Sequence, residues 1–150
     1  MKPLFALVFL AFVAAPAAAQ ESAPDTDVPV ILGAQETDPA EFLWIKRPLV
    51  VFADTPADPR YVEQMGYITE RLDALEERDV VVITDTDPAA RSAWRQKLRP
   101  RGFGLVLIGK DGAIYLRKPL PWQVREIVRS IDKLPARQRE MREGGGTGGS

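Results

Sequence analysis

Acidic side chains follow two apolar segments of the sequence, at the points where those segments end. The apolar runs are Leu49–Phe52 and Val80–Ile83. The polar residues that follow them are Asp54, Thr55, Asp58, Asp85 and Asp87. If the two runs form neighbouring parallel strands, these oxygens gather at the edge where open α/β sheets bind ligands. Carboxylates suit calcium or magnesium, so one hypothesis is a divalent-metal-dependent or carboxylate enzyme that uses Asp54, Asp58 and Asp85.

Two of these aspartates have a simpler interpretation as helix caps. Asp58 and Asp87 each precede a proline, and an aspartate cap followed by proline at the first helical position is a common helix start. This structural role explains both residues without a metal ion. We therefore expect no metal and no cofactor, and carboxylate chemistry remains the alternative to a non-enzymatic function.

A second candidate site is a basic cluster that follows the second acidic group. Its members are Arg91, Arg95, Lys97, Arg99 and Arg101. Such a cluster could hold a phosphate, a sulfated glycan or an acidic protein surface. The alternative is a solvated helix face that pairs with acidic residues of the preceding helix, namely Glu63, Glu70, Glu76 and Glu77. The residues predicted to bind a ligand or partner are Arg91, Arg95, Arg99, Arg101, Asp54, Thr55 and Gly104.

The 150 residues contain no cysteine and no histidine. Thiol redox chemistry needs a thiolate, so a thiol oxidoreductase is excluded. Without histidine, the Ser-His-Asp and Cys-His mechanisms and ordinary zinc sites are excluded as well. We therefore favour a binding or adaptor module over an enzyme.

Alternating apolar runs and amphipathic segments predict an α/β fold. Strands are expected at residues 49–52, 80–83, 103–108 and 113–117, and helices after Asp58, Asp87 and Pro121. The first two strands are parallel through a right-handed crossover, and Asp111-Gly112 indicates a hairpin between the last two. The order β-α-β-α-β-β-α predicts a thioredoxin-like core, a four-stranded mixed sheet in the order 2-1-3-4 flanked by helices.

Two further expectations concern aromatic and charged residues. A short helical turn capped by Asp38 should carry Phe42, Leu43 and Trp44 toward the core. The three tryptophans, Trp44, Trp94 and Trp122, are expected in the core in preference to a sugar-binding platform. Lys110, at the tip of the hairpin, is expected to be exposed and structural.

Composition divides the chain into four parts. Residues 1–19 have the apolar run and the Ala-x-Ala end of a secretory signal peptide, residues 20–37 form an N-terminal arm, residues 38–142 form the domain, and residues 143–150 form a disordered glycine-rich tail. We expect a periplasmic or secreted protein with no membrane anchor after signal cleavage.

Charge is distributed unevenly along the sequence. Residues 21–88 hold 16 acidic and five basic residues, whereas residues 89–142 hold 14 basic and four acidic residues. The expected partner is a periplasmic or envelope protein or an anionic ligand, and nucleic acid is not expected.

Four segments together carry a family resemblance. They are residues 42–53 (Phe-Leu-Trp-Ile-Lys-Arg-Pro-Leu-Val-Val-Phe-Ala), 77–79 (Glu-Arg-Asp), 102–112 (Gly-Phe-Gly-Leu-Val-Leu-Ile-Gly-Lys-Asp-Gly) and 131–141 (Ile-Asp-Lys-Leu-Pro-Ala-Arg-Gln-Arg-Glu-Met). On these segments the chain resembles the bacterial branch of the P-DUDES thioredoxin-like domains, over about residues 39–142. The resemblance implies a domain of unknown function, shared with secreted coiled-coil-domain and sushi-repeat matrix proteins linked to adhesion, and no catalytic residues.

Redox-active thioredoxins are similar in element order alone. Their Cys-x-x-Cys pair lies where this chain has residues 54–58, Asp-Thr-Pro-Ala-Asp, and their cis-proline lies where it has Gly104.

Overall fold

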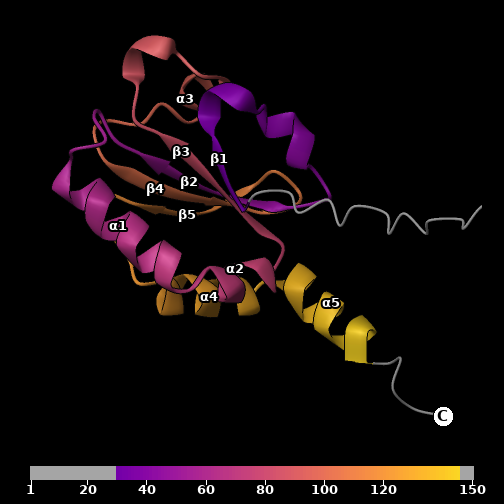
Figure 1. Cartoon of the computed structure of the whole chain (residues 1–150). Coiled ribbons are helices and arrows are strands. Elements are labelled where there is room, and N and C mark those ends of the chain that lie inside the picture. The colour runs from indigo at the N-terminus through magenta and orange to yellow at the C-terminus, as the bar shows by residue number, and fades with distance from the viewer. Residues whose placement is uncertain (1–29, 146–150) are drawn as a thin grey trace, which may run out of the picture.

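A five-stranded mixed sheet between two layers of helices forms the centre of the molecule (Figure 1). The computed structural model describes residues 30–145, so the expected signal peptide, residues 20–29 and residues 146–150 lie outside the described part. The strands are β1 (Ile31–Gly33), β2 (Arg47–Phe52), β3 (Val80–Asp85), β4 (Gly104–Ile108) and β5 (Ile114–Lys118). They lie in the order β1-β3-β2-β4-β5, in which β1, β3 and β2 are mutually parallel and β4 is antiparallel to both of its neighbours, β2 and β5.

The order of the four expected strands is confirmed, but the expected number is one too few. The additional strand, β1, comes from the segment assigned to the N-terminal arm, and it pairs in parallel with the outer edge of β3. The backbone N–H of Val82 also donates to the carbonyl of Val30 at 2.6 Å. A strand of three residues has no periodicity to detect, so only its pairing with β3 defines it.

Helices and short 3₁₀ turns connect the strands. The α-helices are α1 (Pro59–Glu70), α2 (Leu72–Glu76), α3 (Ala93–Leu98), α4 (Val124–Asp132) and α5 (Pro135–Gly145), and the 3₁₀ turns are η1 (Ala34–Glu36), η2 (Pro39–Phe42) and η3 (Pro88–Ala90). Asp38, Asp58 and Asp87 each accept a backbone N–H at a helix start, which confirms their capping role. Helix α5 continues through Gly145, past the tail boundary expected at residue 143. No helix among residues 30–145 is long and apolar enough to cross a membrane.

Side chains of the central strands alternate between two buried clusters. Leu49 and Val51 of β2 contact the cluster formed with α1, α2 and α4, whereas Val50 and Phe52 face the cluster formed with η1, η2 and α3. Because β2, β3 and β4 are covered on both faces, each contains a continuous apolar run, namely Leu49–Phe52, Val80–Ile83 and Leu105–Ile108. The two helix layers therefore leave ligands access mainly to the edges and ends of the sheet.

The aromatic residues near η2 do not all enter the core. Phe42 is buried against Trp94, with 6.0 Å between the ring centroids, but Leu43 is 39% exposed and Trp44 is 75% exposed. Trp44 has a positive φ of 65°, an unusual backbone conformation for a bulky residue, and this turns its side chain outward. The expectation that Leu43 and Trp44 are buried is therefore wrong, whereas it is correct for Phe42 and Trp94.

Gly109, at the start of the hairpin turn, is required by a close approach of an aromatic ring. A Cβ atom at this position would lie 2.1 Å from the ring of Tyr115. We expect Gly109→Ala to displace that ring, break the 2.6 Å hydrogen bond from the Tyr115 hydroxyl to Asp111, and destabilise the fold by about 1–3 kcal/mol in urea unfolding. Gly104→Ala is the matched control, since nothing lies within 4 Å of its Cβ position. Equal stability of the two variants would contradict the expectation.

Candidate functional site

At the carboxyl end of β3, one of the predicted site residues is fully buried and paired with another. Asp85 accepts a 2.8 Å hydrogen bond from Nε of Arg95 and a 2.5 Å hydrogen bond from the hydroxyl of Ser92. The Arg95 guanidinium also donates to the carbonyl of Ala53 at 2.7 Å, so it joins the ends of β2 and β3 to α3. Asp85 and Arg95 are thus partners of each other in the fold, whereas their predicted metal-binding and ligand-binding roles stay predictions.

The acidic residues after β2 are arranged as a loop and a helix cap. Asp58 accepts from the backbone N–H of Arg60 at 2.9 Å and pairs with the guanidinium of the same residue, which lowers the pKa of Asp58. The hydroxyl of Thr55 accepts from the N–H of Ala57, and Asp54 is exposed. Within residues 30–145, no three carboxylates lie close enough together to hold a metal ion. Asp54, Asp58 and Asp85 therefore have separate surroundings in the described part of the chain, and the metal-dependent enzyme stays a prediction.

A groove of about 350 Å³ at the same end of the molecule has a strongly basic lining. Arg99 and Arg101, from the loop after α3, contribute to it together with Arg117 and Lys118 of β5. The other lining residues are Gly104 at the start of β4, Pro100, Phe103, Val106 and Pro119. The lining of this basic groove therefore contains four cationic residues and no acidic one, and the ammonium group of Lys118 lies over the ring of Trp122, which does not line the groove.

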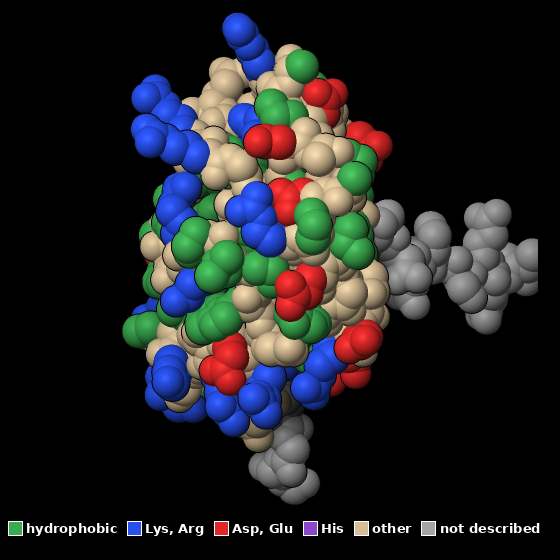
Figure 2. Space-filling view, turned by 90° about the vertical axis from the view of Figure 1, so that its left-hand side faces the viewer, with side chains coloured by type: hydrophobic (Ala, Val, Ile, Leu, Met, Phe, Trp, Pro, Cys, Tyr) green, Lys and Arg blue, Asp and Glu red, His purple; other side chains and the backbone are tan. Residues whose placement is uncertain are grey.

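The cationic residues of the basic groove lack the carboxylate partners that less exposed arginines of the molecule have. None of the four cations forms an ion pair with a residue in the described part of the chain; Arg117 donates to the carbonyl of Leu98, and Lys118 lies 4.6 Å above the ring of Trp122. The expected pairing with acidic residues of α1 and α2 does not form, because these helices cover the face of the sheet opposite to α3 (Figure 1). In Figure 2, Lys and Arg side chains gather at the upper left, and Asp and Glu of the upper half lie further right.

The structure therefore brings together only some of the predicted binding residues. Arg99, Arg101 and Gly104 share the basic groove, whereas Arg91, Asp54 and Thr55 do not line it. Arg117 and Lys118 were not predicted from the sequence. The hairpin register, which pairs Lys118 with Leu105, is the signal that could have placed them beside Gly104.

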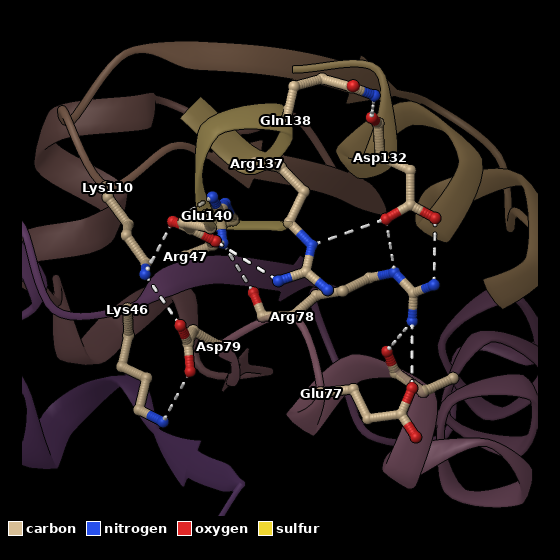
Figure 3. A network of polar contacts seen from close by, with 11 residues as sticks. Lys46, Arg47, Glu77, Arg78, Asp79, Lys110, Asp132, Arg137, Gln138 and Glu140 are labelled. Atoms are coloured by element: carbon tan, nitrogen blue, oxygen red, sulfur yellow. Dashed lines mark hydrogen bonds and ion pairs between the residues drawn. The ribbon is translucent and has the colours of Figure 1, made fainter. Parts of the chain in front are cut away.

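A network of ion pairs occupies the opposite end of the sheet (Figure 3). Arg47, only 1% exposed, binds Glu140 of α5 through two hydrogen bonds of 2.8 and 3.3 Å. Lys110 bridges Asp79 at 2.8 Å and Glu140 at 3.0 Å, so it is half-buried and paired, contrary to the exposed position expected for it. Burial raises the pKa of Glu140, but the bonds from Arg47 and Lys110 outweigh it and lower the pKa to about 2.

A further ion pair of this network joins the turn between α2 and β3 to the end of α4. Arg78 donates from Nε and Nη2 to the two carboxylate oxygens of Asp132, at 2.8 and 3.0 Å, and this lowers the pKa of Asp132. Together these pairs fix α5 against the amino-terminal ends of β2 and β3.

Comparison with known proteins identifies a family and confirms the fold. The family model of DUF4174, described as a domain of unknown function, matches residues 38–140. No curated protein matches the sequence. Among solved structures, Prx1a of Plasmodium yoelii is similar with a TM-score of 0.52 and 18% identity, over 67% of this chain and 80% of that chain. The 2-Cys peroxiredoxin of Plasmodium vivax is similar with a TM-score of 0.53 and 16% identity, over 69% and 83%. At this identity the likeness shows a thioredoxin-like fold alone.

Proposed function

Because this chain belongs to the DUF4174 family, whose function is unknown, we propose a function from its surface: it is a non-redox binding or adaptor module that recognises an anionic group in the basic groove. The observation that carries the proposal is that four cationic residues line one groove and none of them pairs with a carboxylate among the described residues. An anion bearing sulfate or phosphate groups gains charge-assisted hydrogen bonds from arginine, and it reduces the repulsion between the cations.

A comparison with other arginines of the molecule supports ligand binding over a purely structural role. Arg47, Arg78 and Arg95, whose side chains are only 1–16% exposed, all bind carboxylates at 2.8 Å within the fold. Arg99 and Arg101 are exposed, and they add no such stabilisation. Apolar side chains of the groove, such as Phe103 and Val106, exclude water beneath the charges, which strengthens an ion pair formed there.

The test is binding of heparin and of inorganic polyphosphate to the full chain by calorimetry at increasing salt. We expect binding of at least one polyanion that weakens as salt rises, and a loss of about tenfold or more in the variant Arg99→Glu/Arg101→Glu. The matched control is Arg125→Glu/Arg129→Glu, which makes the same change in charge on α4, where both arginines contact Glu126. Equal losses in the two variants would show a response to net charge alone, and no binding of either polyanion would refute the proposal.

Two further proposals concern origin and location. We propose that the chain belongs to the bacterial branch of the P-DUDES domains, on the four segments quoted above. We also propose that it works in the periplasm or outside the cell, which the signal-like residues 1–19 support.

A further inference from the structure

A second groove, distinct from the basic groove, lies beside the exposed Trp44. Its volume is about 460 Å³, and it extends from Trp44 across the hairpin turn to α5, at the end of the sheet that holds the ion-pair network. Tyr115 contributes a second aromatic ring. The size falls within the usual range of about 300–1,000 Å³ for small-molecule sites. We call this hollow the Trp44 groove.

The position of Trp44 has no explanation in the packing of the core. Its side chain is 75% exposed, and its positive φ is held by the bond from its N–H to the carbonyl of Lys110 at 2.7 Å. Backbone strain of this kind is found preferentially where a side chain must be presented for function. The exposed Trp44 side chain is thus available to a ligand in the groove that it lines.

The polar lining of the Trp44 groove is balanced in charge. Three cationic and three anionic side chains contribute to it, and Arg139 and Glu143 at its α5 side form no ion pair with any residue among 30–145. Asp111 is held in place by the hydroxyl of Tyr115 at 2.6 Å. This lining offers both donors and acceptors but no net charge, so it favours neither an anion nor a cation.

We propose that the Trp44 groove binds an uncharged saccharide whose ring stacks on the indole of Trp44. A pyranose ring has an apolar C–H face that suits an aromatic surface, and hydroxyl groups at its rim that both donate and accept hydrogen bonds. An apolar peptide would fit less well, because covering the charged lining without hydrogen bonds is costly. The proposal is independent of the anion site, since the two grooves share no residue.

The test measures calorimetric binding of maltohexaose, cellohexaose and chitohexaose to the full chain and to Trp44 variants. We expect one of them to bind, and Trp44→Gly to weaken this binding about tenfold or more. Glycine accepts a positive φ without strain, so this variant keeps its melting temperature and removes only the ring. Trp44→Tyr, which keeps an aromatic face, is expected to recover part of the affinity.

Two controls separate stacking from other effects. Leu120→Ala removes another exposed apolar side chain, 62% exposed, outside the groove, and Arg99→Glu/Arg101→Glu disables the basic groove. We expect both variants to bind the saccharide as the parent chain does. The proposal fails if none of the three saccharides shows binding at concentrations up to about 10 mM. It also fails if Trp44→Gly binds as well as the parent, or if an aromatic-rich peptide binds at Trp44 and the saccharides do not.

Discussion

Arg95→Met is expected to destabilise the protein by about 3–5 kcal/mol, which is a large part of the stability of a domain of this size. The substitution leaves the carboxylate of Asp85 fully buried, with the hydroxyl of Ser92 and the N–H of Asp87 as its remaining partners. It also removes the donor to the carbonyl of Ala53. A buried charge that loses its counter-ion costs far more than an exposed pair, because water cannot replace the partner. Urea unfolding at neutral pH measures the effect.

A matched control and a double variant make this expectation specific. Arg91→Met changes an exposed arginine two residues before α3 that has no ion pair with a described residue, and we expect a change within about 0.5 kcal/mol. The double variant Asp85→Asn/Arg95→Met removes both charges, so it should be more stable than Arg95→Met alone. If Arg95→Met lowers the free energy of unfolding no more than Arg91→Met does, the Asp85–Arg95 ion pair does not stabilise the fold.

The second large effect is the dependence of stability on pH through Glu140. Its pKa in the folded protein is about 2, below the ordinary 4.5, so the folded state binds fewer protons than the unfolded state between these values. Stability from this group is therefore fully present above pH ~4.5 and is lost as the pH falls through ~2. A shift of this size corresponds to about 3 kcal/mol, and we expect of order 2 kcal/mol because the Glu140 side chain is 27% exposed.

Glu140→Gln tests this contribution directly. The amide cannot ionise, and it leaves the buried guanidinium of Arg47 without its counter-ion, so we expect a loss of about 2 kcal/mol at neutral pH and a shallower decline between pH ~5 and ~2. Some decline remains, since the pKa of Asp132 is also lowered. The control is Glu143→Gln in the same helix, where no ion pair with a described residue is lost. Identical pH profiles of the two variants would assign the acid sensitivity to other carboxylates.

Local sequence determined the elements of the sheet and the starts of the helices. Apolar runs such as Leu49–Phe52 are recognisable because the middle of a strand that is covered on both faces is apolar on both sides. Asp58 and Asp87 cap helices through bonds within two residues. The absence of cysteine from these 150 residues leaves no thiolate for thiol redox chemistry. These features depend on composition or on near neighbours, so they can be inferred without a fold.

Tertiary structure alone decided which charged side chains form ion pairs and which of them line a groove instead. Arg95 and Arg99 lie four residues apart in one basic cluster, yet the former pairs with the buried Asp85 and the latter lines the basic groove. Glu140 and Arg47 meet across 93 residues, and Trp44 is exposed although its neighbour Phe42 is buried. Charge and hydrophobicity are properties of a residue type, whereas pairing and burial depend on where the chain returns in space. For that reason the sequence determined the fold and the excluded chemistry of this protein, and the structure decided where its two candidate binding surfaces lie.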